Sequence, residues 1–393
     1  MRVAVVNLVP TPYREPLYRS LSRTPGLSLR VFYIQSQDSL RGWAGFSSPY
    51  ESIKVPCLTP EFFYPFPVIG VLNRGLIPSL RRFSPRCVLI YGYSCLPQMH
   101  AMKWAIRNRV PYLLWADSNS HRLAAGGALS ALKQAFLRYF CRHAAGVLSI
   151  GSLNEIFWSH YGVEPDRQFR SPLAVDNEYF AAESEKWRRE KEVQRRRLGL
   201  PEGRLLLYVG RFAREKNLLL LLRALAACGR PDGPALSLAL VGGGSEKPRV
   251  DRLIHELGLR NVYQFDFQPQ SELPRFYGVA DALVLPSLDE PWGLVVNEAM
   301  ASQLPVLLSR STGCLPDLLE EGANGYSFDE KDTTSVAACL LRFSRLSEDE
   351  RLRMGLQSAR RIAQWGYTQA LDGIRRALET AMATPGFSAP AAS

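Results

Sequence analysis

Strand-length apolar runs alternate with helix-length segments along almost the whole chain of 393 residues. Runs such as Val88–Tyr91, Gly146–Ile150 and Ala282–Leu285 are almost entirely apolar instead of alternating with polar residues. Strands of that kind are buried on both faces, as in parallel sheets that helices cover on both sides. The pattern therefore predicts an α/β protein built on parallel sheets.

The length of the chain indicates more than one domain, because a single hydrophobic core stops growing at about 250–300 residues. We predict a first domain over residues 1–175 and a second over residues 176–365, each with a doubly wound sheet. Residues 366–385 are predicted as a C-terminal helix and residues 386–393 as a loose tail. The charge-rich stretch Glu183–Arg197 is typical of a solvated helix and opens the second domain.

Cysteine usage and hydropathy narrow the cellular setting. The seven cysteines are spread singly, without a Cys-x-x-Cys pair, which indicates a reducing cytosol and no structural zinc. No stretch reaches the roughly 20 apolar residues that span a bilayer. The apolar start Val3–Val9 is cut by Pro10 and Pro12, so it is interpreted as a strand and not as a signal peptide. We expect a cytoplasmic protein.

Positive charge is concentrated in the first half of the chain. Residues 1–180 hold 20 of the 48 Lys and Arg but only 10 of the 37 Asp and Glu, which gives +10 of the net charge of +11. A basic half indicates an anionic partner, such as a phosphorylated acceptor, an acidic membrane surface or a nucleic acid. A nucleic-acid partner is not expected, because no binding motif and no repeat of aromatic and basic residues is present.

An aromatic segment in the same half raises the question of membrane contact. Phe62–Leu72 is aromatic and apolar and is followed by Arg74, Arg81 and Arg82. One interpretation is a patch that enters the membrane interface while the arginines pair with anionic head groups. The other, of equal weight, is that the aromatics cap the domain core beneath a loop. Peripheral contact with the inner face of the cell membrane therefore stays open.

Two carboxylates, Glu290 and Glu298, enclose seven residues directly after a predicted buried strand. Glu290 comes just before a helix, where a carboxylate accepts hydrogen bonds from sugar hydroxyls. Gly293, Leu294 and Val295 form the first helical turn, whose N–H groups lack intrahelical partners and suit a phosphate. Glu298 is placed about one turn further on for both hydroxyls of a ribose. The alternative, of equal weight for the pair alone, is an N-terminal helix charge and an exposed helix residue.

An earlier strand and turn supply cations. The apolar strand that starts at Leu205 ends at Gly210, which permits a tight turn and close approach to the backbone. Arg211 and Lys216 follow on the loop and the next helical turn, where two cations neutralise a diphosphate. The triple glycine Gly242–Gly244 ends a further strand; alone it is weak evidence and is interpreted mostly as a flexible turn.

Together these residues resemble the retaining glycosyltransferases of family 4, also called glycosyl transferases of group 1, which have the GT-B architecture. The matching motifs run in order through the second half: Gly210–Asn217, Leu240–Gly244, Ala280–Ser287, the pair Glu290 and Glu298, Leu304–Leu307 and Gly322–Tyr326. The resemblance covers Leu205 to Phe328 well, and the ordered set is highly specific.

The resemblance implies two Rossmann-like domains whose parallel sheets face across a deep cleft, with a last helix that crosses back to the first domain. The first domain would bind the acceptor and the second a nucleoside-diphosphate sugar. It implies transfer to an acceptor hydroxyl with retention of the anomeric configuration, without a metal or other cofactor. The departing phosphate oxygen would itself take the acceptor's proton. Glu290 would hold the donor sugar while Arg211 and Lys216 offset charge on the leaving diphosphate.

Two positions in the second half depart from the family pattern. Gln303 replaces the usual glycine before Pro305, and Cys314 replaces a glycine of the next loop. Both are expected to be tolerable changes of packing or turn.

The first half departs more. Many relatives have a glycine pair after the first strand, where this chain has prolines and Arg14, in a helix predicted over Pro12–Arg23 with Thr11 as its N-cap. Arg14 holds a phosphate or an acidic sugar in one interpretation. In the other, of about equal weight, it forms a surface ion pair with a neighbouring acid.

Many relatives also place a catalytically important histidine after the strand that corresponds to Tyr112–Ala116. This chain has Asp117 there, and His121 one helical turn later on a predicted mobile loop. The favoured interpretation is that Asp117 positions an acceptor or donor hydroxyl, because polar residues at strand carboxyl ends line the ligand crevice. The other is that Asp117 caps the turn Ser118–Ser120.

The identity of the substrates is less constrained. We expect a lipid-linked saccharide of bacterial surface polysaccharide assembly as the acceptor, with a soluble small molecule as the second choice. A sugar-nucleotide 2-epimerase is the alternative enzyme class, although the chain offers only five histidines for acid–base chemistry. A nucleotide-sugar sensor without turnover is the non-enzymatic alternative. The sequence does not distinguish a UDP from a GDP sugar.

Overall fold

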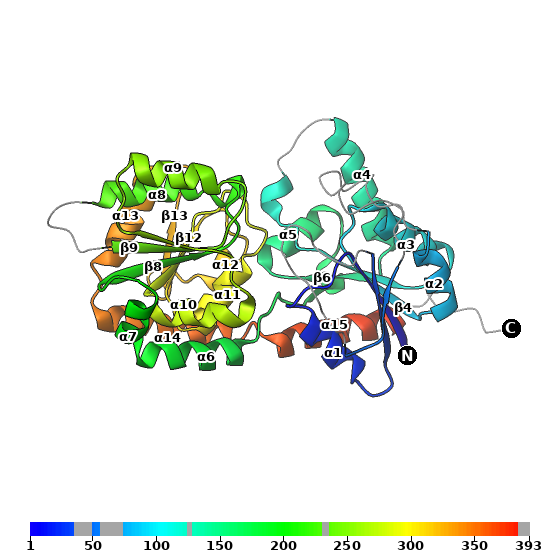
Figure 1. Cartoon of the computed structure of the whole chain (residues 1–393). Helices are drawn as coiled ribbons and strands as arrows, with labels where there is room; N and C mark the ends of the chain where they lie inside the picture. The colour runs from blue at the N-terminus through cyan, green and yellow to red at the C-terminus, as the bar shows by residue number, and fades with distance from the viewer. Residues whose placement is uncertain (35–48, 56–73, 124–127, 230–235, 384–393) are drawn as a thin grey trace. The chain divides into compact units, whose positions relative to one another are not determined.

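The structure, a computed structural model, describes residues 1–34, 49–55, 74–123, 128–229 and 236–383. The chain divides into two compact units (Figure 1). The first comprises Met1–Leu173 together with Tyr367–Ser393, and the second comprises Ala174–Gly366. Each unit is built on one open parallel sheet, which confirms the predicted α/β class with two doubly wound sheets.

The first unit has a seven-stranded sheet in the order β3-β2-β1-β4-β5-β6-β7, and every neighbouring pair is parallel. The strands are β1 (Arg2–Asn7), β2 (Ser28–Tyr33), β3 (Ser52–Lys54), β4 (Cys87–Tyr91), β5 (Tyr112–Trp115), β6 (Gly146–Ser149) and β7 (Gln168–Arg170). The central strands are buried on both faces, as their apolar sequences predict.

The helices of the first unit are α1 (Glu15–Ser22), α2 (Leu76–Phe83), α3 (Leu96–Arg107), α4 (Ala128–His143), α5 (Ser152–His160) and α15 (Tyr367–Ala383). Side chains of α2 to α5 form one hydrophobic core with alternate residues of the strands, such as Val6, Ile90 and Leu114. Helix α15 packs on β4 to β7 and on α1. Its buried residues include Ile374 and Leu378.

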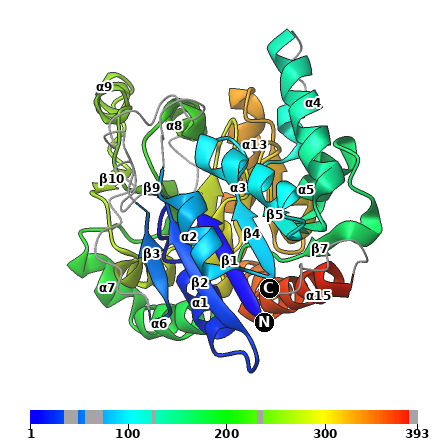
Figure 2. The same ribbon diagram turned by 90° about the vertical axis from the view of Figure 1, so that its right-hand side faces the viewer.

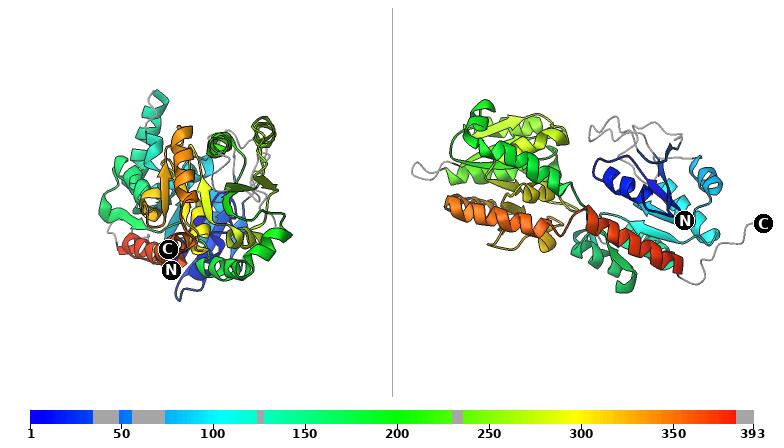
Figure 3. Two further views of the ribbon diagram at one scale, coloured as in Figure 1. Left: turned by 90° about the vertical axis from the view of Figure 1, so that its left-hand side faces the viewer. Right: turned by 90° about the horizontal axis from the view of Figure 1, so that it is seen from below.

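The last helix, α15, which is red in the right-hand view of Figure 3, packs against β7, the strand at the edge of the first sheet. A Cβ atom on Gly373 would lie 1.9 Å from the carbonyl oxygen of Arg170, so only glycine allows this approach. The Ser171 hydroxyl donates a hydrogen bond to the carbonyl of Ala370 (3.0 Å). The hydrogen bond joins two residues that are 199 positions apart in the sequence, and both contacts attach α15 to the first sheet.

The second unit has a six-stranded sheet in the order β10-β9-β8-β11-β12-β13, again with parallel neighbours. The strands are β8 (Arg204–Val209), β9 (Leu236–Val241), β10 (Val262–Phe265), β11 (Ala282–Leu285), β12 (Val306–Ser309) and β13 (Gly325–Phe328). The helices are α6 (Asn177–Arg189), α7 (Lys191–Arg197), α8 (Leu218–Cys228), α9 (Lys247–Glu256), α10 (Leu273–Val279), α11 (Leu294–Ala301), α12 (Leu315–Leu318), α13 (Thr333–Ser344) and α14 (Glu348–Ile362).

Both sheets reverse their strand order at an inner strand. In the first unit β1 lies between β2 and β4 (Figure 2), and in the second β8 lies between β9 and β11. At such a switch point the connections leave to opposite sides, which opens a crevice at the carboxyl ends of the two strands. At the first switch point, Arg14 follows β1 and Tyr91 ends β4. At the second, Gly210 follows β8 and Glu290 follows β11.

A buried ion cluster fixes α7 to the second sheet. Asp281 accepts from Lys191 (2.6 Å) and from Arg195 (2.8 Å), as well as from the backbone N–H of Leu205 (2.7 Å). Burial alone would raise the pKa of Asp281, but the two cations outweigh burial and hold the pKa below its ordinary value. The cluster is therefore a charged anchor within the unit.

Several predicted boundaries were wrong. Helix α1 begins at Glu15 and not at Pro12, because Pro16 suits the first turn of a helix while the carbonyl of Thr11 already accepts from the backbone N–H groups of Arg14 and Glu15. The hydroxyl of Thr11 makes no hydrogen bond in the described part of the chain, so it is not the N-cap.

Other differences concern the edges of the sheets and the helix ends. The short strand β3 was not predicted, and the predicted helix Glu183–Arg197 is two helices, α6 and α7. The aromatic segment Phe62–Leu72 and the predicted tail 386–393 lie outside the described residues. Across the described ranges, no helix is long and apolar enough to cross a membrane.

Candidate active site

The predicted donor residues of the second unit gather at the β8–β11 switch point. Glu290, which follows β11, is buried with only 8% of its surface exposed, and its carboxylate forms an ion pair with Lys216. Ser287 donates a second hydrogen bond to the same oxygen, Oε2, at 3.3 Å. The contact between Lys216 and Glu290 joins two residues that are 74 positions apart in the sequence, as expected for loops that leave adjacent strands.

The backbone of Glu290 is held as firmly as its side chain. Its carbonyl accepts from the N–H of Gly313 (2.8 Å), and Glu290 forms a parallel bridge with Thr312. A Cβ atom on Gly313 would lie 1.9 Å from the carbonyl oxygen of Pro291, so the contact requires glycine. The interpretation of Glu290 as an ordinary helix charge does not account for this double fixation.

The loop after β8 presents two cations in different environments. Lys216 ends the short 3₁₀ turn Arg214–Lys216, and its side chain is 16% exposed. Arg211 is more open, with 45% of its side chain exposed, and pairs with Glu215 at 2.9 Å. The hydroxyl of Tyr208 donates to the carbonyl of Arg211 (2.8 Å). Burial, with a further contribution from Glu290, raises the pKa of Tyr208 well above its ordinary value, so this hydroxyl stays a donor.

We interpreted the triple glycine Gly242–Gly244 mostly as a flexible turn, but in the structure it holds a neighbouring loop in place. Gly242 has φ of 139° and Gly244 has φ of 150°, both in a region that favours glycine. Cβ atoms there would lie 2.0 Å from the carbonyl oxygen of Gly210 and 2.5 Å from that of Phe212. The backbone N–H of Phe212 donates to the carbonyl of Gly243 (2.8 Å). The glycines thus seat the Gly210–Phe212 loop against its neighbour.

Helix α11 begins beside Glu290. Its N-cap is Gly293, with φ of 96°, and a Cβ atom there would lie 3.3 Å from Cγ of Glu290. Leu294 and Val295 are half-buried, whereas the later residues of the helix are buried. The first-turn N–H groups, which have no intrahelical acceptor, are therefore at the accessible end of the helix.

Glu298 lies in the second turn of α11 and is fully buried. The hydroxyl of Tyr277, on α10, donates to Oε2 of Glu298 at 2.6 Å. The alternative of an exposed helix residue is therefore wrong. Sequence reasoning missed Tyr277, which lies 21 positions away and carries no charge that would mark it. Binding of ribose by Glu298 stays a prediction.

Asp117, in the first unit, follows the carboxyl end of β5 and is half-buried. Within the described residues its carboxylate accepts no hydrogen bond, so the capping role is not found. Asn154 holds the loop on both sides of it, because Nδ2 donates to the carbonyls of Ala116 (3.0 Å) and Ser118. Oδ1 of Asn154 accepts from the backbone N–H of Ile150 (3.1 Å). Asn154 was not predicted, and no sequence motif marks it.

The two other predicted residues of this region differ in setting. His121 is exposed in a short 3₁₀ turn, Ser120–Leu123. Arg14 caps α1 and lies with its guanidinium carbon 3.4 Å from the ring centroid of Tyr91. No carboxylate of the described part of the chain pairs with Arg14, so the predicted surface ion pair is not found.

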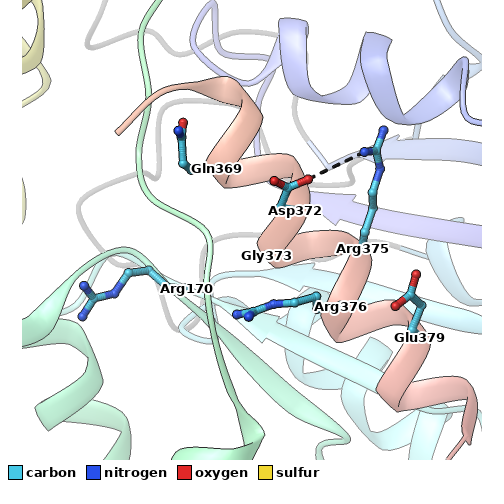
Figure 4. A pocket seen from close by; sticks show the side chains of 7 residues that line it. All are labelled: Arg170, Gln369, Asp372, Gly373, Arg375, Arg376 and Glu379. Atoms are coloured by element: carbon cyan, nitrogen blue, oxygen red, sulfur yellow. Dashed lines mark ion pairs between the residues drawn. The ribbon is translucent and has the colours of Figure 1, made fainter. Parts of the chain in front are cut away.

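A hollow of about 530 Å³ lies beside the end of β7 (Figure 4). None of the predicted site residues lines it; the lining residues are Arg170, Gln369, Asp372, Gly373, Arg375, Arg376 and Glu379. Arg170 pairs with Glu155 at 2.6 Å, and Arg375 lies 3.7 Å from Asp372. Two of its arginines are thus paired with carboxylates of the first unit, and we do not assign a ligand to it.

The described residues contain no cluster of three or more His, Cys, Asp or Glu side chains that could hold a metal ion. The charges at the β8–β11 switch point are instead those of Glu290, Lys216 and Arg211. Together with the first turn of α11, they provide cations and N–H donors beside a fixed carboxylate. Such a set suits an anionic ligand that also carries hydroxyl groups.

Comparison with known proteins gives matches at the levels of family, sequence and fold. The model of the family "Glycosyl transferases group 1" matches residues 190–361. The D-inositol 3-phosphate glycosyltransferase of Corynebacterium glutamicum is 32% identical over 343 residues, covering 82% of this chain and 78% of the relative. The protein of the same name from Corynebacterium efficiens is 32% identical over 399 residues, covering 90% and 89%.

Solved structures with lower identity share the fold. Sucrose-phosphate synthase from Thermosynechococcus elongatus matches with a TM-score of 0.74 at 17% identity, over 96% of this chain and 98% of that one. Anabaena HepE in complex with UDP and glucose matches with a TM-score of 0.69 at 15% identity, over 97% and 100%.

Proposed function

The chain belongs to the group 1 glycosyl transferases, with the GT-B fold, and we propose that it moves a sugar from a nucleoside-diphosphate donor to an acceptor hydroxyl with retention of configuration. We include in the proposal that no metal ion or other cofactor takes part. The observation that carries it is the buried pair of Glu290 and Lys216 at the β8–β11 switch point. One group of the pair suits sugar hydroxyls and the other a diphosphate.

Each donor residue has a role in this proposal. Glu290 accepts hydrogen bonds from the donor sugar, while Lys216 and Arg211 neutralise the diphosphate. The N–H groups at Gly293, Leu294 and Val295 bind a phosphate oxygen. Glu298, oriented by the Tyr277 hydroxyl, accepts from the ribose hydroxyls. Gly210 lets the diphosphate approach the backbone closely.

The chemical step follows from charge development. The bond between the anomeric carbon and the diphosphate oxygen breaks, and a bond from the anomeric carbon to the acceptor oxygen forms on the same face. The proton of the acceptor hydroxyl passes to the departing phosphate oxygen. Lys216, Arg211 and the α11 N-terminus stabilise the charge that grows on that oxygen, and we expect this stabilisation to lower the barrier more than any other effect in the site. Asp117 orients the acceptor hydroxyl.

Support for the acceptor comes from the relatives and changes the order of the two predicted classes. The relatives that match most of the chain are named for D-inositol 3-phosphate. The segment from which membrane contact was predicted, Phe62–Leu72, lies outside the described residues. We therefore place a small hydroxyl-rich acceptor first. A lipid-linked saccharide of bacterial surface polysaccharide assembly is the alternative, in which the cytoplasmic enzyme would bind the inner membrane face.

The first experiment is binding of UDP, GDP, ADP and their common sugar conjugates to the full chain, with a chelator and without added metal. We expect one base to raise the melting temperature, since a ligand stabilises the native state by mass action. Glu298→Ala and Lys216→Ala should weaken that binding about tenfold or more. Arg214→Ala is the matched control, because Arg214 is exposed on the same turn as Lys216.

The second experiment separates the enzyme classes. Release of UDP or GDP that requires an added acceptor identifies a transferase, whereas an altered sugar nucleotide without acceptor identifies an epimerase. Binding without turnover on soluble or lipid-linked acceptors would identify a sensor. Equal nucleotide binding by Lys216→Ala, Glu298→Ala and the native protein would contradict the site assignment.

A further inference from the structure

The β1–β4 switch point of the first unit carries an arginine with an unusual setting. Arg14 lies between the end of β1 and α1, and its guanidinium carbon is 3.4 Å from the ring centroid of Tyr91, the last residue of β4. Trp115, the last residue of β5, lies 5.7 Å away by the same measure. Three neighbouring strands thus contribute an aromatic platform and a cation at the edge where ligands of such sheets bind.

Stacking on Tyr91 leaves the hydrogen-bonding edge of Arg14 available. Nε of Arg14 is buried without a hydrogen-bond acceptor. Arg14 as a whole is half-buried, and its two terminal nitrogens have no partner among the described residues. A guanidinium stacked in this way has one face covered by the ring while its planar fork of N–H donors can still bind phosphate or carboxylate bidentately.

The adjacent carboxylate, that of Glu15, forms no ion pair with Arg14 among the described residues. Oε1 of Glu15 accepts hydrogen bonds from the hydroxyls of Tyr33 (2.9 Å) and Tyr50 (2.6 Å). Glu15 is 7% exposed, so its carboxylate is directed into that buried tyrosine cluster. No ion pair to Arg14 forms at any of the described positions. The cation therefore lies next to a carboxylate of which one oxygen, Oε1, is already hydrogen-bonded to two tyrosines.

A second donor nearby is unsatisfied. Nε1 of Trp115 is buried and makes no hydrogen bond in the part of the chain that the structure describes. Buried donors are usually paired, so two unpaired donors, on Arg14 and Trp115, at one sheet edge indicate a place built for an acceptor atom. Both groups donate and neither accepts, and the guanidinium is positively charged, which favours an anion over a neutral hydroxyl.

We propose that Arg14, stacked on Tyr91, binds an anionic group of the acceptor, a phosphate or a carboxylate carried by a sugar or polyol. This proposal rests on the proposed transferase function and names the class of its acceptor. Arg14 makes no bond to the reacting atoms; it fixes the far end of the acceptor and selects charged acceptors over neutral ones. The interpretation against which it is tested is a stacking contact that only stabilises the N-terminus of α1.

The test is calorimetric titration of the full chain, alone and with saturating UDP, with matched pairs of probes. The pairs are D-inositol 3-phosphate with myo-inositol, and glucuronate with glucose, and inorganic phosphate is the minimal probe. We expect the native protein to bind the anionic member of one pair about tenfold or more tightly than its neutral partner. The pair that shows the preference tells phosphate from carboxylate.

Three variants make the test specific. Arg14→Gln should abolish the preference, and Arg14→Lys should keep part of it, because lysine retains the charge without the fork. Arg19→Gln, which removes the same charge from an exposed position of α1, should change nothing. A stacking contact alone predicts equal preference in all three variants, with at most a lower melting temperature for Arg14→Gln.

The titrations distinguish a failure of the proposed anion site from a failure of the proposed function. If the native protein binds neither anionic probe at about 10 mM, or if Arg14→Gln keeps the preference, the anion site does not exist. UDP binding in the same samples reports on the second unit and shows that each variant is folded. Normal UDP binding with no anion preference overturns only the inference, whereas an anion preference without nucleotide binding overturns the proposed donor site.

Discussion

The pair of Lys216 and Glu290 gives the sharpest prediction, because its two members should affect nucleotide binding in opposite directions. Lys216→Met removes the cation to which we assign the diphosphate, and we expect the affinity for UDP to fall about tenfold to a hundredfold. Glu290→Gln removes a negative charge from the same place, so UDP should bind as tightly as before or more tightly. The UDP sugar should lose affinity in Glu290→Gln, because the carboxylate is the proposed partner of the sugar hydroxyls.

The magnitude of the coupling between the two side chains follows from their burial. Two unit charges at about 4 Å attract by about 4 kcal/mol at an effective dielectric constant of about 20. The side chains are only 16% and 11% exposed, so solvent screens them little, but desolvation offsets part of the attraction. We expect Lys216→Met to lower the free energy of unfolding by about 3 kcal/mol, since it leaves a buried charge unpaired. The double variant should be about 2 kcal/mol more stable than the two single losses predict.

The assay is urea unfolding of the four proteins in the double-mutant cycle, followed by titration with UDP and with its sugar conjugates. Arg214→Ala serves as the control for loss of a cation from the same turn. If the losses of unfolding free energy in the two single variants add up to the loss in the double variant, the ion pair does not form in solution. Weaker UDP binding in Glu290→Gln would refute the division of labour between sugar and diphosphate.

Three further predictions concern the fold and the first unit. Gln303→Gly should raise the free energy of unfolding by about 0.5–1 kcal/mol in urea, because Gln303 has φ of 57° after α11, where a side chain is strained. The pKa of Asp281 in the folded protein lies below its unfolded value of about 3.9. Ionised Asp281 therefore stabilises the fold above that pH, and this contribution is lost as the pH falls through the folded pKa. We expect Asp281→Asn to flatten the acid limb of the curve of unfolding free energy against pH. Asn154→Ala should lower turnover with an acceptor but leave UDP affinity unchanged, because it frees the loop that carries Asp117; equal losses of both would indicate general destabilisation.

The architecture was predictable because it is written in local patterns. Buried parallel strands need continuous apolar runs, and the runs at Val88–Tyr91 and Ala282–Leu285 became β4 and β11. Strand β3 was missed because it is three residues long and partly exposed, so it carries no such run. The start of α1 was misplaced because the prolines suit several positions near a helix N-terminus, and only the backbone bonds of Thr11 decide between them.

The site was predictable where charge marks a residue and unpredictable where neutral residues orient it. Glu290 and Lys216 stand out in the sequence, and the strand order then brings them together. Tyr277 and Asn154 are neutral, and each acts on a residue 21 to 38 positions away, so their role depends on packing that a single sequence does not contain. Gln303 shows the converse, since its substitution for glycine was visible but its left-handed backbone was not.

The two switch points follow one topological rule and differ in charge. At the second, Lys216 is already paired with Glu290. In the proposed donor site we therefore expect a diphosphate to compete with the carboxylate for the lysine and, when it succeeds, to free the same carboxylate for sugar hydroxyls. We expect this competition to couple binding of the diphosphate to binding of the sugar, which would favour the intact nucleotide sugar over either part. At the first, Arg14 has no ion-pair partner among the described residues, and Oε1 of the neighbouring Glu15 is hydrogen-bonded to two tyrosine hydroxyls. An anion binding there meets no such competition, so a simple anion such as inorganic phosphate should itself compete with the acceptor, whereas free glucose should compete poorly with the donor.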